Sequence, residues 1–401
     1  MTTTGFASSP TIRLRSARDV LAAIPHLLGY RPAECVVVAG VTGRGRLGPL
    51  VHVTLADLPI AGAGRRHTVA QRVGAAGATS AVVGVYTDRA EATVRALVDP
   101  LLADLEAAVG DVDAWLVTAE GFRGLDCADP ACCPPGGHPR VDLDAGAVGA
   151  AFVLSGSSVA RTAEEAFDIP RAPRAARDLA GRAARRSERA GQAARSDVGT
   201  RREWEHDGLS VWRDAVRHAA TERELATAGE DTAGEDTAGE VTVPGRVPLP
   251  PASLGRLAAS LAATIVRDAV LMDIVAQACP ADGGGRAPWE PGPDLDQQAA
   301  EACGRLLDPS FAVFPDKVAT SVVRAVLEAT VAHAPRRLQP APLTLLALVA
   351  WWRGEGGLAG ARVRAALEID DGYRLAVLVQ DILAAGIPPG WVGRSWAEGV
   401  R

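Results

Sequence analysis

The stretch Ser16-Ala-Arg-Asp-Val-Leu-Ala-Ala-Ile-Pro-His-Leu-Leu-Gly29, with the run Cys35-Val-Val-Val-Ala-Gly-Val41 that follows it, decides the fold of the first part of the chain. Ser16, with Asp19 three positions on, is typical of a helix N-cap, and apolar residues at helical spacing continue to Gly29. The run from Cys35 predicts a strand. Further strands are predicted at 50–55, 81–86 and 115–118, with a helix over 94–105. This alternation predicts a sheet covered on at least one face.

The chain as a whole is predicted to be α+β in four parts. Residues 12–154 form a sandwich-like α/β domain, and 155–225 an arginine-rich helical connector. Residues 226–250 include the repeat Thr227-Ala-Gly-Glu-Asp, which is acidic and glycine-containing and predicts a disordered insertion. Residues 251–401 form a mostly helical domain, in which one apolar stripe runs from Leu254 to Met272.

The C-terminal part has the spacing of a repeat-type helical hairpin. Small and apolar residues between Leu346 and Ala366 fall at the positions of a tetratricopeptide-like pair of helices, and a further helix is expected from Leu375 to Ala385. One such unit is also what an ordinary helical hairpin would show. Helical pairs of this kind generally bind proteins, so we expect a protein partner at the C-terminal helices.

Composition excludes several classes of protein. The formal net charge is −6, and 42 residues are basic, all but Lys317 being arginine. Ten arginines within 171–202 spread around a helical wheel without interleaved aromatic residues, which disfavours a nucleic-acid groove. The longest apolar run, 343–352, is half the roughly 20 residues that a membrane span needs. With no signal-peptide pattern and too few cysteines for a disulfide scaffold, a cytoplasmic protein is expected.

The chemistry-bearing residues gather in Cys127-Ala-Asp-Pro-Ala-Cys132-Cys133-Pro134-Pro135-Gly136-Gly137-His138. Cys127, Cys132, Cys133 and His138 supply the ligand count of a zinc site. Adjacent cysteines in an extended segment, however, would point in different directions. Two alternatives stay open, which are a proline-stiffened turn with buried cysteines and a reversible disulfide from Cys127 to Cys132 or Cys133.

Two other motifs are weaker. Gly43-Arg-Gly45-Arg-Leu-Gly48 has dinucleotide-binding spacing, but the residues after it read as a strand, so a hairpin turn is predicted. His26 precedes Gly29-Tyr30-Arg31-Pro32 at a helix-to-strand junction, where a crevice can form. The alternative there is a turn in which Arg31 neutralises the carbonyls of the helix end and Tyr30 packs inward.

Three pieces of the sequence carry a resemblance to a known family. They are the Ile24–Val38 segment, the C-x4-C-C-P run from Cys127, and the segment from Leu343 through Pro389. Together these resemble an actinobacterial family of uncharacterised proteins, the domain of unknown function 4192. The resemblance implies a bacterial cytoplasmic protein with this layout. It implies no catalytic residue and no cofactor.

Two hypotheses for function follow. The first is a non-enzymatic binding or regulatory module with a metal site at the cysteines and a partner on the C-terminal helices. The second is an enzyme, either a metal-assisted hydrolase or a thiol-dependent catalyst, in which Asp126 or Asp129 acts as the base beside three metal ligands. Whether the protein is an enzyme is left open by the sequence.

Overall fold

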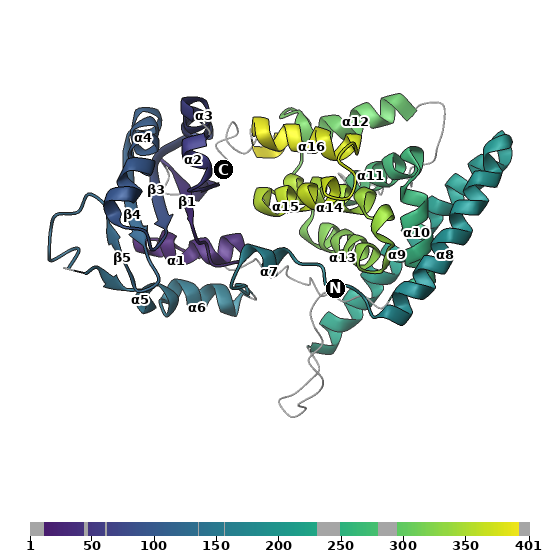
Figure 1. Cartoon of the computed structure of the whole chain (residues 1–401), viewed down its shortest axis with the longest axis horizontal. Helices are drawn as coiled ribbons and strands as arrows, with labels where there is room; N and C mark the ends of the chain where they lie inside the picture. The colour runs from purple at the N-terminus through teal and green to yellow at the C-terminus, as the bar shows by residue number, and fades with distance from the viewer. Residues whose placement is uncertain are drawn as a thin grey trace, which may run out of the picture. The chain divides into compact units, whose positions relative to one another are not determined.

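The computed structural model describes residues 12–43, 47–60, 62–134, 136–155, 157–230, 249–279 and 295–392. The chain divides into two compact units, Met1–Asp168 and Ile169–Arg401 (Figure 1). The predicted α+β class is confirmed, since the described sheet lies in the first unit and the second is helical. The acidic repeat expected at 226–250 lies largely outside the described residues, and its first residues continue a helix to Glu230.

The first unit is built on a mixed sheet with the order β2-β1-β3-β4-β5-β6. β3 and β4 are parallel, and the other neighbours are antiparallel. The strands are β1 (Cys35–Thr42), β2 (Leu47–Thr54), β3 (Ala78–Tyr86), β4 (Asp111–Val117), β5 (Gly121–Gly124) and β6 (His138–Pro139). The strands predicted from the sequence at the positions of β1 to β4 are confirmed.

Helices cover both faces of this sheet, whereas the sequence predicted cover on at least one face. Val36 and Val38 of β1 belong to a core shared with α3 and α4, whereas Val37 and Ala39 belong to a core shared with α1 and α5. The alternation of the strand explains this, because successive side chains point to opposite faces. The helices of this unit are α1 (Ala17–Leu28), α2 (Asp57–Ile60), α3 (Gly62–Ala75), α4 (Glu91–Val109), α5 (Val141–Asp144), α6 (Ala147–Leu154) and α7 (Ala163–Phe167).

Helix α1 has the ends that its sequence predicts. The Ser16 side chain accepts a hydrogen bond from the Asp19 N–H at 3.2 Å, and Gly29 closes the helix with φ +79°. Gly84 in β3 allows α1 to pack closely, because a Cβ there would lie 3.0 Å from Leu21 of α1 and 2.7 Å from the Tyr86 ring. The sheet therefore fixes the position of α1, which carries Arg18 toward the cysteine loop.

The second unit packs most of its helices around one large core that includes the fully buried Trp212, with two smaller clusters beside it. Its elements are α8 (Arg174–Ala193), α9 (Val198–Glu230), α10 (Pro251–Leu261), α11 (Thr264–Ala278), α12 (Leu295–Leu307), α13 (Lys317–His333), α14 (Pro340–Trp352), α15 (Gly356–Leu367) and α16 (Arg374–Ala385), with short 3₁₀ turns at Ala194–Ser196 and Arg336–Leu338. The helix predicted from Leu375 to Ala385 is confirmed as α16.

Two features of this unit differ from expectation. Helices α8 and α9 lie within the expected connector, yet Leu209 and Trp212 of α9 are part of the main core. The stripe from Leu254 to Met272 is divided between α10 and α11, because Ala263 has an extended backbone. α14 and α15 pack against each other, as a helical hairpin requires. Their likeness to a tetratricopeptide unit stays a prediction.

One described segment, Arg374–Val392, is long and apolar enough to span a membrane by length and composition. Helix α16 ends within it at Ala385, where Gly386 adopts a left-handed conformation with φ +56°. The 12 helical residues of α16 fall short of the roughly 20 that a bilayer requires.

Candidate functional site

The cysteine loop joins β5 to β6 at one edge of the sheet. The β5–β6 pairing sets Phe122 opposite His138, which brings the two ends of the loop together. Gly137 has φ +81°, and a Cβ there would lie 2.8 Å from the Phe122 carbonyl oxygen. A side chain at 137 would therefore both strain the backbone and push β6 from β5. The Gly136-Gly137 pair is thus what allows the chain to return tightly to the sheet.

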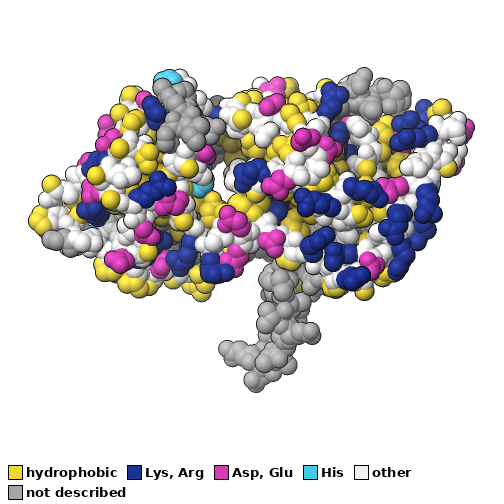
Figure 2. All heavy atoms as spheres, in the orientation of Figure 1, with side chains coloured by type: hydrophobic (Ala, Val, Ile, Leu, Met, Phe, Trp, Pro, Cys, Tyr) yellow, Lys and Arg dark blue, Asp and Glu magenta, His cyan; other side chains and the backbone are white. Residues whose placement is uncertain are grey.

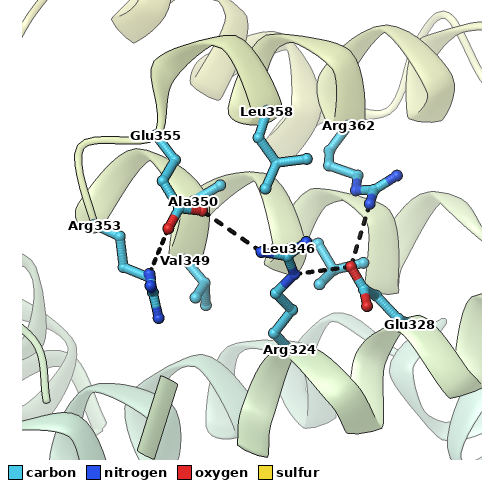
Figure 3. Close-up of a pocket in the computed structure, with 9 residues that line it drawn as sticks. All are labelled: Arg324, Glu328, Leu346, Val349, Ala350, Arg353, Glu355, Leu358 and Arg362. Carbon is cyan, nitrogen blue, oxygen red and sulfur yellow. Dashed lines mark hydrogen bonds and ion pairs between the residues drawn. The ribbon is translucent and has the colours of Figure 1, made fainter. Parts of the chain in front are cut away.

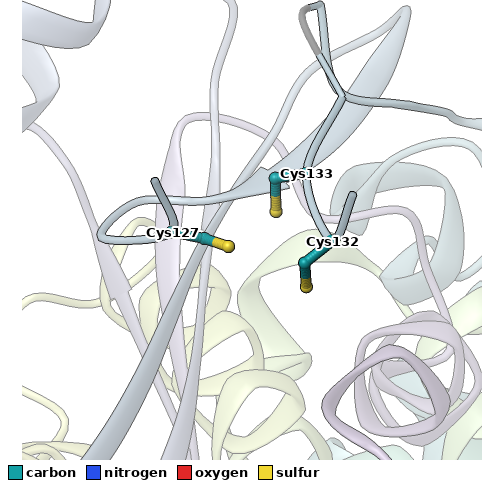
Figure 4. Close-up of side chains that lie close together, drawn as sticks. All are labelled: Cys127, Cys132 and Cys133. Carbon is teal, nitrogen blue, oxygen red and sulfur yellow. The ribbon is translucent and has the colours of Figure 1, made fainter. Parts of the chain in front are cut away.

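The structure brings three of the four predicted ligands together. The Sγ atoms of Cys127, Cys132 and Cys133 all lie within 4.8 Å of one another, and the Cys127 sulfur points toward the other two side chains (Figure 4). Cys132 is exposed, and the other two are partly exposed. The expectation that adjacent cysteines would diverge is wrong here. The segment is a turn, in which the N–H groups of Cys132 and Cys133 both donate to the Asp129 carbonyl, at 3.1 and 2.8 Å.

The strand before the loop contributes to this convergence. Gly124 donates its N–H to the Cys133 Sγ at 3.4 Å. A Cβ at Gly124 would lie 2.9 Å from the Cys127 Cβ. The missing side chain therefore lets both cysteines approach the end of β5.

His138 lies beside the cysteine group, and its ring is engaged elsewhere. Its Nε2 lies 2.6 Å from the Cys132 carbonyl oxygen and also contacts Nη2 of Arg18. Arg18 of α1 lies against the same ring, 3.1 Å from Nδ1, and over the Phe122 ring at 5.5 Å. Residue Arg18 was missed from the sequence, because nothing local links it to a residue 120 positions away. Arg18 and His138 thus hold the backbone of Cys132 rather than join the sulfur group.

The two proposed bases are also occupied. The Asp126 carboxylate forms an ion pair with Arg95 of α4 at 2.7 Å. The Asp129 carboxylate accepts a hydrogen bond from the Ala131 N–H at 2.9 Å and so shapes the turn. Both side chains contribute to the shape of the loop, which leaves neither poised as a general base.

The three thiols are not equivalent. A backbone hydrogen bond at Asp129, followed by hydrogen bonds from Cys133 and Cys132, lowers the pKa of Cys127. The pKa of Cys132 is raised, first because its thiol donates a hydrogen bond to Cys127 and second because it faces the negative charge of the Cys127 thiolate. Cys127 therefore becomes a thiolate at a lower pH than Cys132 does.

This difference gives a direct prediction for thiol reactivity. Brief treatment with iodoacetamide at pH 7.5 should label Cys127 faster than Cys132, since alkylation requires the thiolate. Buried Cys35, whose pKa burial raises to about 12, should stay unlabelled until the protein unfolds. Peptide mass spectrometry at several reaction times measures all three rates in one sample. Faster labelling of Cys132 would contradict the assignment.

The other predicted motifs have structural roles. β1 and β2 form an antiparallel hairpin around the glycine-rich segment, so the predicted hairpin is confirmed on its described residues and no helix opens there. His26 stacks on Phe152 at 5.0 Å and lies 3.1 Å from the Ser157 Oγ, and burial lowers its pKa. Tyr30 is buried as expected. Arg31 pairs with Asp144 at 2.9 Å, which corrects its expected role at the helix carbonyls.

A second charged site lies in the helical unit, between α13, α14 and α15 (Figure 3). Glu328 accepts from Arg324 at 2.9 Å and from Arg362 at 3.2 Å, and Arg353 pairs with Glu355 at 2.7 Å. The hollow between them has space for about one water-sized molecule, roughly 10 Å³. Because each of these guanidinium groups faces a carboxylate, the arrangement reads as an ion-pair network that ties the three helices together.

The fold and the site together define a two-unit α+β protein with a cluster of three thiols at the edge of its sheet. A model of the family described as domain of unknown function (DUF4192) matches residues 18–282 and 305–390, and the chain belongs to this family. No curated protein and no solved structure matches the chain.

Proposed function

We propose that the first unit is a zinc-binding module in which Cys127, Cys132 and Cys133 hold one ion. The observation that carries the proposal is the convergence of three sulfurs within 4.8 Å of one another. Tetrahedral zinc with Zn–S distances of about 2.3 Å separates its sulfur ligands by about 3.8 Å. The loop therefore needs to contract by at most about 1 Å to close on the ion.

Zinc fits the chemistry better than a hard cation does. Thiolates select borderline or soft metals, whereas magnesium and calcium prefer oxygen ligands. The three sulfurs leave a fourth coordination position for water or another donor. His138 lies outside this ligand set, where its ring contacts the Cys132 carbonyl oxygen at 2.6 Å. The predicted set of three cysteines with His138 is thereby reduced to the three cysteines, with His138 beside them.

The role that we propose for the ion is structural. Cys127 follows β5, whereas Cys132 and Cys133 precede β6, so one ion would join the two ends of the loop and fix the sheet edge. The hydrolase alternative receives less support, because Asp126 and Asp129 are occupied by Arg95 and by the Ala131 N–H. We therefore propose a non-enzymatic binding or regulatory protein that works in the reducing cytoplasm.

The helical unit would supply the partner-binding surface of this module. Leu378 of α16 and Ile387 just after it are 57% and 46% exposed, which leaves apolar surface on the C-terminal helices. A protein partner that recognises this surface should be lost from a Leu378→Asp variant and retained by an Asp381→Asn variant of the same helix. Equal recovery of the same partners with both variants would remove this part of the proposal.

Zinc titration against a competing chromogenic chelator tests the metal site. We expect one zinc per chain. A Cys133→Ala variant should bind zinc on the order of 100- to 1,000-fold more weakly, because it loses one of four ligands and with it about one quarter of the binding free energy. A His138→Ala variant should lose about 10- to 100-fold, as is typical for a residue that orients a ligand.

A Cys303→Ala variant is the matched control, since Cys303 is exposed and belongs to α12 of the second unit. It should bind zinc as the parent chain does. If the parent protein binds less than about one-tenth equivalent, or if Cys133→Ala binds as tightly as Cys303→Ala, the proposed site is wrong.

A further inference from the structure

The exposed side of α8 carries a row of arginines. Arg182, Arg185, Arg186 and Arg189 are all exposed, and their spacing of i, i+3, i+4 and i+7 sets them on one side of the helix. We call these four residues the arginine face. With a rise of 1.5 Å per residue, it is about 10 Å long. Figure 2 shows basic side chains gathered over α8 at the right-hand edge of the view.

The opposite side of α8 is buried and fixes its rotation. Ala180, Gly181, Ala183 and Ala184 are buried, and α8 meets α10 so closely that a Cβ on Gly255 would collide with the Ala180 carbonyl. This corrects the expectation that the arginines surround the helix. That expectation treated 171–202 as one helix, whereas α8 ends at Ala193. Between Ala180 and Arg189 the small residues take one half of the wheel, and the four arginines take the other.

The arginine face has no neutralising acids in the described part of the chain. The two carboxylates of α8 are used elsewhere, since Asp178 faces Arg174 at 4.0 Å and Glu188 forms an ion pair with Arg337. An ordinary solvated helix face interleaves charges of both signs. The chain uses arginine for every basic residue but Lys317, so the absence of lysine here is ordinary, whereas the absence of an acid on the same side of the helix between these arginines is not.

We propose that the arginine face binds the phosphate backbone of double-stranded DNA without reading its sequence. Guanidinium groups bind phosphates through paired hydrogen bonds, and four of them in a row match a polyanion. The wide major groove of B-form DNA admits the convex side of an α-helix, whereas the major groove of A-form RNA is too narrow.

Two other polyanions fit this surface less well. Single strands are held largely by stacking on aromatic rings, and the nearby Trp204 is turned inward, with its indole N–H donating to the Ser187 carbonyl at 3.1 Å. A membrane-bound helix inserts an apolar side into the bilayer. The apolar side of α8 is already buried against α10, which would leave only the charges for a lipid surface.

The number of contacts sets the expected salt dependence. Four phosphate contacts give a slope of about −3.6 in a plot of log affinity against log salt concentration. Raising the salt from 50 to 200 mM should therefore weaken binding by about 150-fold. Each arginine removed should reduce the slope by about 0.9.

The test uses the full chain and a fluorescently labelled 24-base-pair duplex, with binding measured by anisotropy at both salt concentrations. The Arg182→Gln/Arg185→Gln/Arg186→Gln/Arg189→Gln variant should lose at least about 100-fold in affinity at 50 mM salt. A control of equal charge change replaces four exposed arginines outside α8 by glutamine, namely Arg13, Arg161, Arg217 and Arg374. Far-UV circular dichroism checks that both variants are folded.

Retention of binding by the control, with loss in the α8 variant and the steep salt slope, supports the proposal. An equal loss in both variants would mean that only the overall charge matters, and would overturn it. No binding of the parent chain to the duplex at 50 mM salt would also overturn it. A third result would overturn it as well. In that result, vesicles with 30% phosphatidylserine displace the labelled duplex, whereas an unlabelled duplex added at the same concentration of charge does not.

Discussion

Replacing Asp273 by alanine should destabilise the helical unit by about 4 kcal/mol, because it removes a buried carboxylate that three side chains share. Asp273 is 3% exposed. It accepts hydrogen bonds from the Trp212 indole N–H at 2.9 Å, from Gln277 at 2.6 Å and from Arg213 at 3.3 Å. The substitution leaves the Trp212 N–H without its acceptor in the middle of the core, where no water replaces it cheaply.

Urea unfolding followed by tryptophan fluorescence measures this change. Asp268→Ala is the matched control in the same helix, because Asp268 is 46% exposed and its partner Arg267 keeps a hydrogen bond to the Tyr373 hydroxyl at 3.2 Å. An ion pair with one half-exposed partner contributes about 1 kcal/mol, so the control should lose far less stability than Asp273→Ala. Equal stabilities of the two variants would show that the carboxylate of Asp273 does not hold the core.

Replacing Gly255 by alanine should lower the free energy of unfolding by about 3 kcal/mol. A Cβ at this position would lie 2.6 Å from the carbonyl carbon of Ala180, and closer still to its oxygen. These are backbone atoms, so α8 and α10 must move apart, which also opens the packing around Leu254 and Leu257. The clash outweighs the roughly 1 kcal/mol that alanine ordinarily adds to a helix over glycine.

Thermal unfolding followed by circular dichroism should show the melting temperature of Gly255→Ala falling by about 6–12 °C. Gly304→Ala is the control, since a Cβ at that position in α12 meets nothing within 4 Å. It should be as stable as the parent or more stable, by up to about 1 kcal/mol. A Gly255→Ala protein that melts at the parent temperature would contradict the close approach of α8 and α10.

Local sequence signals predicted those parts of the fold that depend on neighbouring residues. Ser16 and Gly29 mark the ends of α1 because a cap is a contact within one turn. The all-apolar run from Cys35 indicates a strand buried on both faces. The sequence did not predict the break between α10 and α11, because no local signal marks it. Ala262-Ala263 contains neither glycine nor proline, and the apolar stripe continues across it.

In the candidate site, too, local features were predictable from the sequence and contacts between distant residues were not. Cys127, Cys132 and Cys133 stand within seven residues, so their grouping was visible in the sequence, whereas the turn that aligns their sulfurs depends on the Asp129 carbonyl. The distance of His138 from this group was not predictable, because it depends on pairing with Phe122 and on Arg18 of α1. Such pairings join residues far apart in the chain, and spacing alone does not encode them.

X-ray absorption at the zinc edge of the purified, zinc-loaded protein tests the central claim most directly. The account predicts three sulfur atoms at about 2.3 Å and one nitrogen or oxygen at about 2.0 Å. The Cys133→Ala protein, if it retains zinc at all, should show one sulfur fewer. A first shell made only of nitrogen and oxygen in the parent protein, or a shell that Cys133→Ala leaves unchanged, would contradict the three-cysteine site.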